Sequence, residues 1–95
     1  MPVTRIHHYT VEAADLPELL TRRATVISAV RAAYPGLART WLTRLEDGTF
    51  ADIWRWDSAE QMQAALVVMP IPEAIAAMSL AHDASAQDGE IIDER

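Results

Sequence analysis

Two adjacent histidines, His7 and His8, are the side chains of this sequence best suited to proton transfer. A neutral imidazole accepts a proton near physiological pH, and a phenolic hydroxyl is a suitable donor to it. The surrounding residues predict a strand, in which consecutive side chains point to opposite faces of the sheet. The two rings therefore cannot bind one metal ion together, and we expect His7 to face a substrate cavity as a catalytic base. The alternative is that both rings are structural or bridged by solvent.

One carboxylate and two guanidinium groups could act on an anionic substrate. The Asp-Gly pair at 47–48 is typical of a two-residue type I′ hairpin turn. Counting outward from that turn places Thr43 opposite Asp52 and puts Arg39 on the same sheet face. We expect Asp52 to be the second candidate base, and Arg39, or Arg5 in the first strand, to stabilise a phenolate or enolate. The alternative is a structural hydrogen-bond network that includes Thr43.

Large aromatic side chains gather on the same predicted face. The hairpin register pairs Trp41 with Trp54 and adds Trp56 and Phe50 beside them. These rings could stack a planar polycyclic ligand. The alternative is that they pack the core and a dimer interface.

Four further side chains complete the predicted substrate site. Tyr9 shares a strand face with His7. Met62 and Met78 lie on helices expected to face the sheet, where flexible thioethers either fill the core or line a pocket for flat ligands. His82 ends an alanine-rich helix, a place where a cation is also favourable as a cap.

No residue pattern indicates a metal or cofactor site. The chain has no cysteine, and its histidines and carboxylates show none of the usual metal-ligand spacings. Its 3 glycines form no phosphate-binding loop, and no nucleophile motif of acyl-transfer enzymes is present. We therefore expect neither a metal nor a cofactor.

The elements that must position these residues begin with a strand over Val3 to Val11. A helix follows Asp15, whose spacing to Glu18 matches a capping box, and ends at Pro35-Gly36. Three arginines lie off the centre of its apolar stripe and are expected to be solvated: Arg22, Arg23 and Arg31. Two hairpin strands, Leu37 to Glu46 and Thr49 to Asp57, come next.

The second half of the chain predicts helix and one more strand. Ser58 and Gln61 form a second capping box. The elements after it are, in order, a helix over Ala59 to Met69, a break at Pro70-Ile71-Pro72, a helix over Glu73 to His82, a loop over Ala84 to Gly89 and a strand over Glu90 to Glu94. The alternative is that residues 70–89 form an irregular loop.

This order of elements predicts an α+β, ferredoxin-like split β-α-β fold with a four-stranded antiparallel sheet in the order 4-1-3-2. With 95 residues the chain makes one domain over residues 1–95. Helices cover one face of such a sheet, and an apolar uncovered face marks an interface. We expect a homodimer with two sheets packed face to face. The pattern leaves open which face meets the helices.

Charge and hydropathy exclude several partners. The net charge of −6 argues against a nucleic-acid binder, which needs a basic stripe, and against an anionic membrane surface. The uncharged run from Gln61 to Pro72 is too short to span a bilayer, and the N-terminus has no signal-type apolar core. We expect a cytoplasmic protein with no nucleic-acid or membrane partner.

Three segments carry a resemblance to a known family. The segment from Asp52 to Glu60 (DIWRWDSAE), Pro35-Gly36 before the second strand, and Gly89-Glu90-Ile91-Ile92 occur in the order and at the chain length typical of the antibiotic biosynthesis monooxygenase family. The resemblance implies a dimeric α/β barrel with a cavity between sheet and helices in each subunit. It also implies an activity. Some relatives oxidise phenolic or anthrone-type polyketides with dioxygen and no metal or flavin, others degrade haem, and others are isomerases.

The sequence departs from the haem-degrading relatives in three places. These relatives carry an Asn on strand one, near the position of His7, a Trp in the second helix, which is absent here, and a His several residues before the position of His82. Many members also carry a Glu two residues before the strand-end Trp, where this chain has Trp54.

The hypothesis that follows is a cofactor-independent monooxygenase for a phenolic, anthrone or quinone-type small molecule, with a place in secondary metabolism. His7 and Asp52 would be its bases, and the arginines would stabilise the anion. The alternatives are a non-catalytic dimeric barrel that binds a small hydrophobic metabolite or a partner protein, and a haem-binding relative.

Overall fold

A computed structural model describes all residues from 1 to 95. Its elements, in chain order, are β1 (Val3–Val11), a short 3-10 turn (Ala13–Asp15), α1 (Leu16–Ala33), β2 (Leu37–Arg44), β3 (Phe50–Trp56), α2 (Ala59–Val67), α3 (Pro72–Met78) and β4 (Ala81–Glu90).

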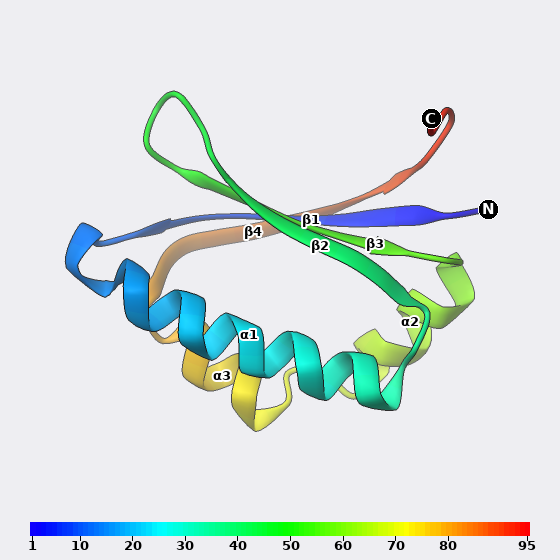
Figure 1. Cartoon of the computed structure of the whole chain (residues 1–95), viewed down its shortest axis with the longest axis horizontal. Helices are drawn as coiled ribbons and strands as arrows, with labels where there is room; N and C mark the ends of the chain where they lie inside the picture. The colour runs from blue at the N-terminus through cyan, green and yellow to red at the C-terminus, as the bar shows by residue number, and fades with distance from the viewer.

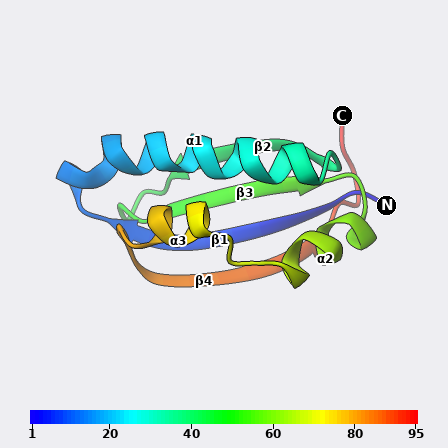
Figure 2. The same cartoon turned by 90° about the horizontal axis from the view of Figure 1, so that it is seen from below.

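The four strands form one antiparallel sheet in the order β2-β3-β1-β4. All three helices lie on one face of this sheet, and the other face has no helix on it (Figure 1). Seen from the helical side, α1 runs along β2 and β3, whereas α3 lies over β1 (Figure 2). The predicted ferredoxin-like α+β fold and its strand order are confirmed.

The β2–β3 hairpin turn differs from the predicted one. The Leu45 N–H donates to the carbonyl oxygen of Thr49 at 2.8 Å, and the Gly48 N–H donates to that of Leu45 at 3.0 Å. Gly48 alone in this turn has a positive φ, of 86°. This is a three-residue loop with a glycine bulge, not a type I′ turn. Asp47 favours it, because its Oδ1 accepts hydrogen bonds from the N–H and the hydroxyl of Thr49 at 2.9 and 2.6 Å.

The extra loop residue shifts the hairpin register by one position. Trp41 pairs with Ile53 and Thr40 pairs with Trp54, so the predicted pairing of Trp41 with Trp54 is wrong. A one-residue shift turns every side chain of a strand to the opposite face. Trp41 and Arg39 therefore lie on the face away from the helices, where Trp41 remains 41% exposed.

The last strand also differs from its prediction. β4 pairs with β1 from Val11 back to Val3, across the segment that the sequence assigns to a loop. The predicted strand over Glu90 to Glu94 is wrong, and α3 ends at Met78 rather than at His82. β4 is an exposed edge strand of small and polar residues, so no apolar alternation marks it. Its backbone hydrogen bonds to β1 hold it in place.

The two predicted helix caps have different outcomes. Ser58 accepts a hydrogen bond from the N–H of Gln61 at 3.2 Å, so the second cap is confirmed. Asp15 makes no capping hydrogen bond to α1, because it ends the preceding 3-10 turn with helical backbone angles, whereas an N-cap residue is extended. The capping box with Glu18 is therefore not formed. The helix before the proline pair ends at Val67, two residues earlier than predicted.

The core lies between the helices and the sheet face that carries Val3, Tyr9, Phe50, Trp54 and Trp56. From α1 the core receives four residues: Leu19, Val26, Ile27 and Val30. No single helix is long and apolar enough to cross a membrane. The pair α2 and α3 passes that test of length and composition only when the two are taken together, and it is bent by 89°.

Candidate functional site

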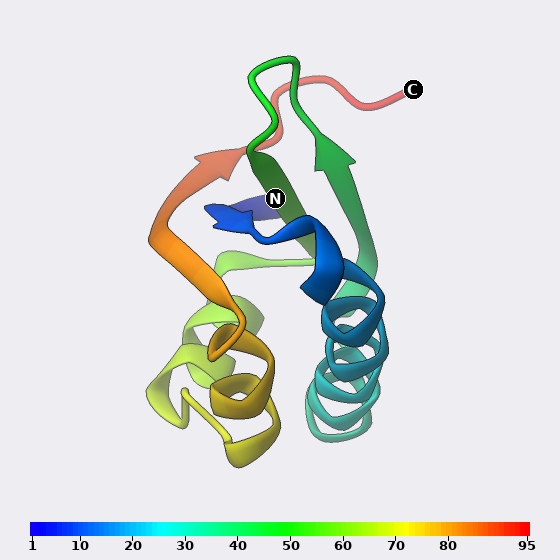
Figure 3. The ribbon, with the colours of Figure 1, turned by 90° about the vertical axis from the view of Figure 1, so that its left-hand side faces the viewer.

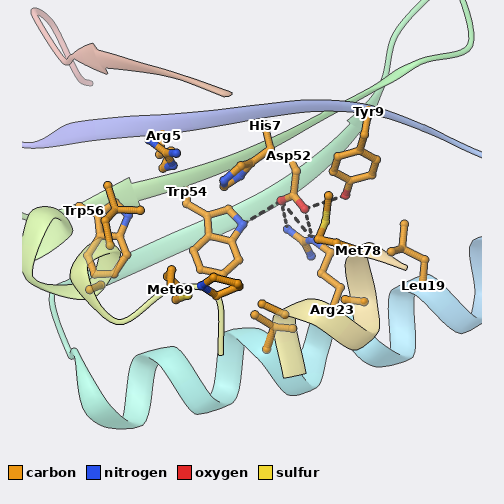
Figure 4. Close-up of a pocket in the computed structure, with 16 residues that line it drawn as sticks. Arg5, His7, Tyr9, Leu19, Arg23, Asp52, Trp54, Trp56, Met69 and Met78 are labelled. Carbon is orange, nitrogen blue, oxygen red and sulfur yellow. Dashed lines mark hydrogen bonds and ion pairs between the residues drawn. The ribbon is translucent and has the colours of Figure 1, made fainter. Parts of the chain in front are cut away.

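A cavity of about 220 Å³ lies between the sheet and the three helices. One wall is the helix-facing side of β1 and β3 (Figure 4). The other walls are side chains of α1, α2, α3 and the segment between α2 and α3 that contains Met69 and Pro70. In the end-on view of Figure 3, α1 lies on one side of the helical layer and α2 with α3 on the other. The cavity lining is mostly hydrophobic with a few polar groups, as in ordinary ligand pockets. The lining residues are Arg5, His7, Tyr9, Leu19, Arg23, Val26, Asp52, Trp54, Trp56, Ala65, Leu66, Met69, Pro70, Ala74, Ala77 and Met78.

A buried carboxylate, Asp52, is the polar centre of the cavity. Arg23 donates from Nε to both carboxylate oxygens at 3.1 and 3.0 Å, and from Nη2 to Oδ1 at 2.9 Å. The Tyr9 hydroxyl donates to Oδ2 at 2.8 Å, and the Trp54 indole N–H donates to Oδ1 at 2.9 Å. Asp52 is only 6% exposed, and its negative charge is matched by Arg23. The network holds three cavity side chains in fixed positions.

His7 lies beside this network on β1. It pairs directly with Asp52 in the strand register, and its ring meets that of Trp54 edge-on, with the ring centroids 6.0 Å apart. Figure 4 shows the imidazole pointing into the cavity between Arg5 and Asp52. Burial lowers the pKa of His7 below its ordinary value of 6.5 and outweighs the opposite effect of the Asp52 charge. The imidazole is therefore neutral near pH 7 and able to accept a proton.

Tyr9 is held in its protonated form. Burial raises the pKa of its phenol, and the negative charge of Asp52, to which the hydroxyl donates, raises it further. Tyr9 therefore acts as a hydrogen-bond donor to Asp52 rather than as a base.

Arg5 and Trp56 lie at the other end of the polar lining. Arg5 donates from Nη1 to both carboxylate oxygens of Asp88 on β4, at 2.9 and 3.1 Å. Its Nε–H and the indole N–H of Trp56 are both buried and have no hydrogen-bond partner in the protein. Unpartnered buried donors are rare and costly, so each one calls for an explanation.

Several predicted site residues do not line the cavity. Arg39 and Trp41 lie on the outer sheet face because of the shifted hairpin register. His82 lies in β4, pairs with Thr10 of β1 and is exposed on that same outer face. Met62 faces inward but is buried in the core at 3% exposure, outside the cavity lining. No group of three or more His, Cys, Asp or Glu side chains is arranged to hold a metal ion.

Arg23 is the polar cavity residue that sequence reasoning missed. It was expected in solvent, but its side chain is only 16% exposed and binds Asp52. The signal was present in the sequence, since Arg23 lies four residues after Leu19 and four before Ile27, both of which are buried. A basic residue in the middle of an apolar stripe needs a buried partner.

The structure is similar to solved structures of other proteins. Along the whole chain the structure is similar to SnoaB of Streptomyces nogalater, a cofactor-independent oxygenase (25% identity, 98% of this chain and 95% of that chain, TM-score 0.77). It is also similar to MhuD of Mycobacterium tuberculosis, a haem degrader solved with two haems in its active site (29% identity, 98% of each chain, TM-score 0.70). The fold also matches a Caulobacter crescentus protein provisionally named an antibiotic biosynthesis monooxygenase (15% identity, 97% of this chain and 91% of that chain, TM-score 0.72).

The resemblance to the antibiotic biosynthesis monooxygenase family is confirmed at the level of structure. No protein-family model matches the sequence, and no curated protein does. SnoaB and MhuD share this fold but perform different reactions. The function of this chain must therefore be argued from its cavity side chains. Of the three histidines, only His7 lines the cavity, and the helix-end position expected for His82 is instead part of the outer edge strand.

Proposed function

We propose that this protein is a cofactor-independent monooxygenase for a small phenolic, anthrone or quinone-type molecule. The observation that carries the proposal is a neutral imidazole, that of His7, facing an apolar cavity beside a fully paired carboxylate. A base of this kind can remove a proton from an acidic O–H or C–H group held against it. The likeness to the oxygenase SnoaB supports the same chemistry.

The reaction begins with His7 removing a proton from the substrate, which leaves an electron-rich enolate or phenolate. This anion passes one electron to dioxygen, and the resulting substrate radical and superoxide combine through a new C–O bond. The imidazolium returns its proton to the terminal peroxide oxygen. His7 then removes the remaining proton from that carbon as hydroxide leaves, and it passes this proton to the hydroxide, which gives a carbonyl, one water and a neutral imidazole. A methylene group and one dioxygen thus become a ketone and one water, and the substrate supplies every electron.

Asp52 has a different part from the one its sequence position suggests. Its two oxygens already accept hydrogen bonds from Tyr9, Arg23 and Trp54. Few lone pairs remain for a substrate proton, and protonation would leave the Arg23 charge buried without a partner. Asp52 is therefore a positioning residue that fixes Tyr9 and Trp54 around the ring of the substrate, and His7 is the base.

Cavity size and polarity favour a flat, uncharged substrate. Trp54 and Trp56 supply aromatic faces, and Met69 and Met78 supply adaptable thioethers on the opposite side. The cavity volume of about 220 Å³ is smaller than that of pockets for drug-sized ligands, which is about 300–1,000 Å³. Two or three fused rings suit this space better than a tetrapyrrole does. An apolar lining also keeps water from the anion and from the peroxide.

The assembly that we propose is a homodimer formed by the outer sheet faces. This face carries the half-buried Ile6 and Ile53 and the 41% exposed Trp41, with no helix over them. Apolar side chains that lie together on an uncovered sheet face are typical of an interface. Arg39 and Arg55 on the same face add charged groups suited to the rim of such an interface.

Haem binding is the second candidate, because the 29% identity to MhuD covers 98% of both chains. His7 is the one cavity histidine that could bind the iron. The side chains of α2 and α3 would have to move apart to admit a porphyrin. Titration with haem distinguishes this candidate, since coordination by His7 produces a Soret shift that the His7→Gln variant lacks.

The proposed activity is tested by oxygen uptake. Purified protein is supplied with a panel of hydroxyanthrones and naphthols, in the presence of a chelator and without added flavin, and is compared with heat-denatured protein. The proposal expects uptake above the control and a product that has gained one oxygen atom and lost two hydrogen atoms. Saturable binding of these compounds, seen as tryptophan quenching, without oxygen uptake would instead identify a non-catalytic binding protein.

A further inference from the structure

Two buried N–H groups at one end of the cavity have no partner in the protein, the Nε–H of Arg5 and the indole N–H of Trp56. Both residues line the cavity, and Trp56 is 2% exposed, so bulk water does not reach its indole N–H. A buried donor left without an acceptor destabilises the folded protein. If a bound ligand supplies the acceptor, the two unpartnered donors destabilise only the ligand-free protein.

The strand register brings these two donors to the same place. Val3 pairs with Trp56 and Arg5 pairs with Trp54, so Arg5 and Trp56 are diagonal neighbours on one face of two adjacent strands. Diagonal neighbours have their Cβ atoms within about 7–8 Å, a distance that an arginine and a tryptophan side chain can bridge. Figure 4 shows both side chains at the same end of the cavity, on the far side of His7 from Tyr9 and Arg23.

The other Arg5 contacts orient its unpartnered group. Asp88 on β4 accepts two hydrogen bonds from Nη1 and draws that edge of the guanidinium toward the rim. The Nε–H stays buried beside the cavity. The lining's one carboxylate, Asp52, does not accept from it, since Asp52 is bound by Arg23, Tyr9 and Trp54. This end of the cavity therefore offers two N–H donors, one of them on a guanidinium whose charge is paired with Asp88.

From this juxtaposition we infer that Arg5 and Trp56 form an oxygen-binding subsite. A carbonyl or phenolate oxygen of the substrate accepts hydrogen bonds from them, while the substrate atom that gives up its proton contacts His7. The inference rests on the proposed function and names the substrate's orientation and class. Arg5 and His7 are two residues apart on one strand face, which places them about 6.6 Å apart along the strand. At this separation the two side chains can contact opposite edges of one planar substrate. The substrate is therefore a conjugated ketone or phenol whose negative charge, created at His7, is delocalised across the ring to an oxygen at Arg5 and Trp56.

A binding experiment without dioxygen turnover tests this subsite. The probe is 1,4-naphthoquinone, whose carbonyl oxygens only accept hydrogen bonds, and the matched control is naphthalene, which has the same rings and no acceptor. The chain has no cysteine or lysine side chain that the quinone could modify. In a proton–nitrogen correlation spectrum the three tryptophans give three indole N–H signals, which substitutions of Trp41 and Trp54 assign.

The expected result is a downfield shift of the Trp56 indole proton on saturation with naphthoquinone, with little shift on saturation with naphthalene. Trp56→Phe should weaken naphthoquinone binding about three- to tenfold, and Arg5→Met by tenfold or more, with naphthalene affinity unchanged. The matched control is Trp41→Phe, the same substitution on the outer face, which should change neither affinity.

Three results would overturn the inference. These are equal Trp56 shifts with both probes, equal loss of affinity for both probes in the variants, and no saturable binding of naphthoquinone at millimolar concentration. The spectrum of the wild-type protein decides the question even if Trp56→Phe fails to fold. The subsite and the oxygenase activity fail separately, because a protein that binds quinone through Trp56 but consumes no oxygen retains the subsite and loses the reaction.

Discussion

Arg23 Nη2 lies 2.9 Å from Asp52 Oδ1, and this ion pair joins the long helix α1 to the middle of β3 inside the cavity. Both side chains are largely buried. A pair in this position cannot be broken on one side without leaving a charge in an apolar environment. The ion pair therefore supports both the fold and the arrangement of the cavity.

The first prediction concerns the stability that this pair supports. Asp52→Asn leaves the Arg23 guanidinium buried without a counter-charge and should lower the free energy of unfolding by about 3 kcal/mol. Adding Arg23→Met should recover part of that loss, because the double variant removes both charges. Urea denaturation of the two single variants and the double variant measures the coupling.

The control for this cycle is an exposed ion pair on the same helix. Glu18→Gln removes the contact between Glu18 and Arg22, which are 56% and 36% exposed, and should cost about 0.5 kcal/mol or less. If Asp52→Asn costs no more than Glu18→Gln, Asp52 does not have the structural importance that its network indicates.

The second prediction concerns stability in acid. The pKa of His7 is lower in the folded protein than its unfolded value of 6.5, so between these two values the unfolded chain binds more protons. The contribution of His7 to the free energy of unfolding is fully present above pH 6.5 and is lost as the pH falls below that value. His7→Gln should therefore show a smaller loss of stability on acidification than the wild type, measured as the denaturation midpoint at several pH values. Parallel pH profiles for the two proteins would contradict the burial of a neutral imidazole.

The third prediction concerns the pH dependence of oxygen consumption. A neutral His7 is the active form, so kcat/KM should rise with pH, with an apparent pKa below 6.5, and then level off. The charges that act on this ring are those of Asp52, Asp88 and Arg5. Asp88→Asn removes one of the negative charges and should move the acid limb to still lower pH. An acid limb that stays in place in His7→Gln would assign the titration to another group.

The fourth prediction concerns assembly through the outer sheet face. Trp41→Glu adds a charge to the proposed interface and should convert the homodimer to a monomer that remains folded, because Trp41 is already 41% exposed. Light scattering after gel filtration gives the mass. Val67→Glu adds the same charge to an 84% exposed position on α2 and should leave the dimer intact. A monomeric wild type would remove this part of the proposal.

The architecture could be predicted from the sequence because its signals are local and strong. The β-branched and aromatic residues of Val3–Val11 predict β1, and the spacing of Leu19, Ile27 and Val30 predicts α1. Ser58 marks the start of α2 with a real capping hydrogen bond. With these elements in order, the handedness rule for crossovers leaves few strand orders, and the observed one is the usual one.

The candidate site was harder to predict because it depends on single-residue choices. The Asp47-Gly48 pair is compatible with both a two-residue and a three-residue loop, and the side-chain hydrogen bonds from Thr49 to Asp47 favour the latter. That choice removes Arg39 and Trp41 from the cavity face. β4 depends on its partner strand rather than on its own residues, which moves His82 to the outer face. β1 and β3 were placed correctly, and His7, Asp52 and Trp54 are together as a result.

The measurement that tests the central claim most directly compares wild type with His7→Gln during oxidation of a hydroxyanthrone under isotopically heavy dioxygen, with a chelator and no added flavin. The account predicts that wild type forms a quinone carrying one heavy oxygen atom. It predicts that His7→Gln is about 100- to 10,000-fold slower while its quinone-binding spectrum is unchanged. Equal rates in the two proteins, or a quinone without the heavy isotope, would contradict the assignment of His7 as the base of a cofactor-independent oxygenase.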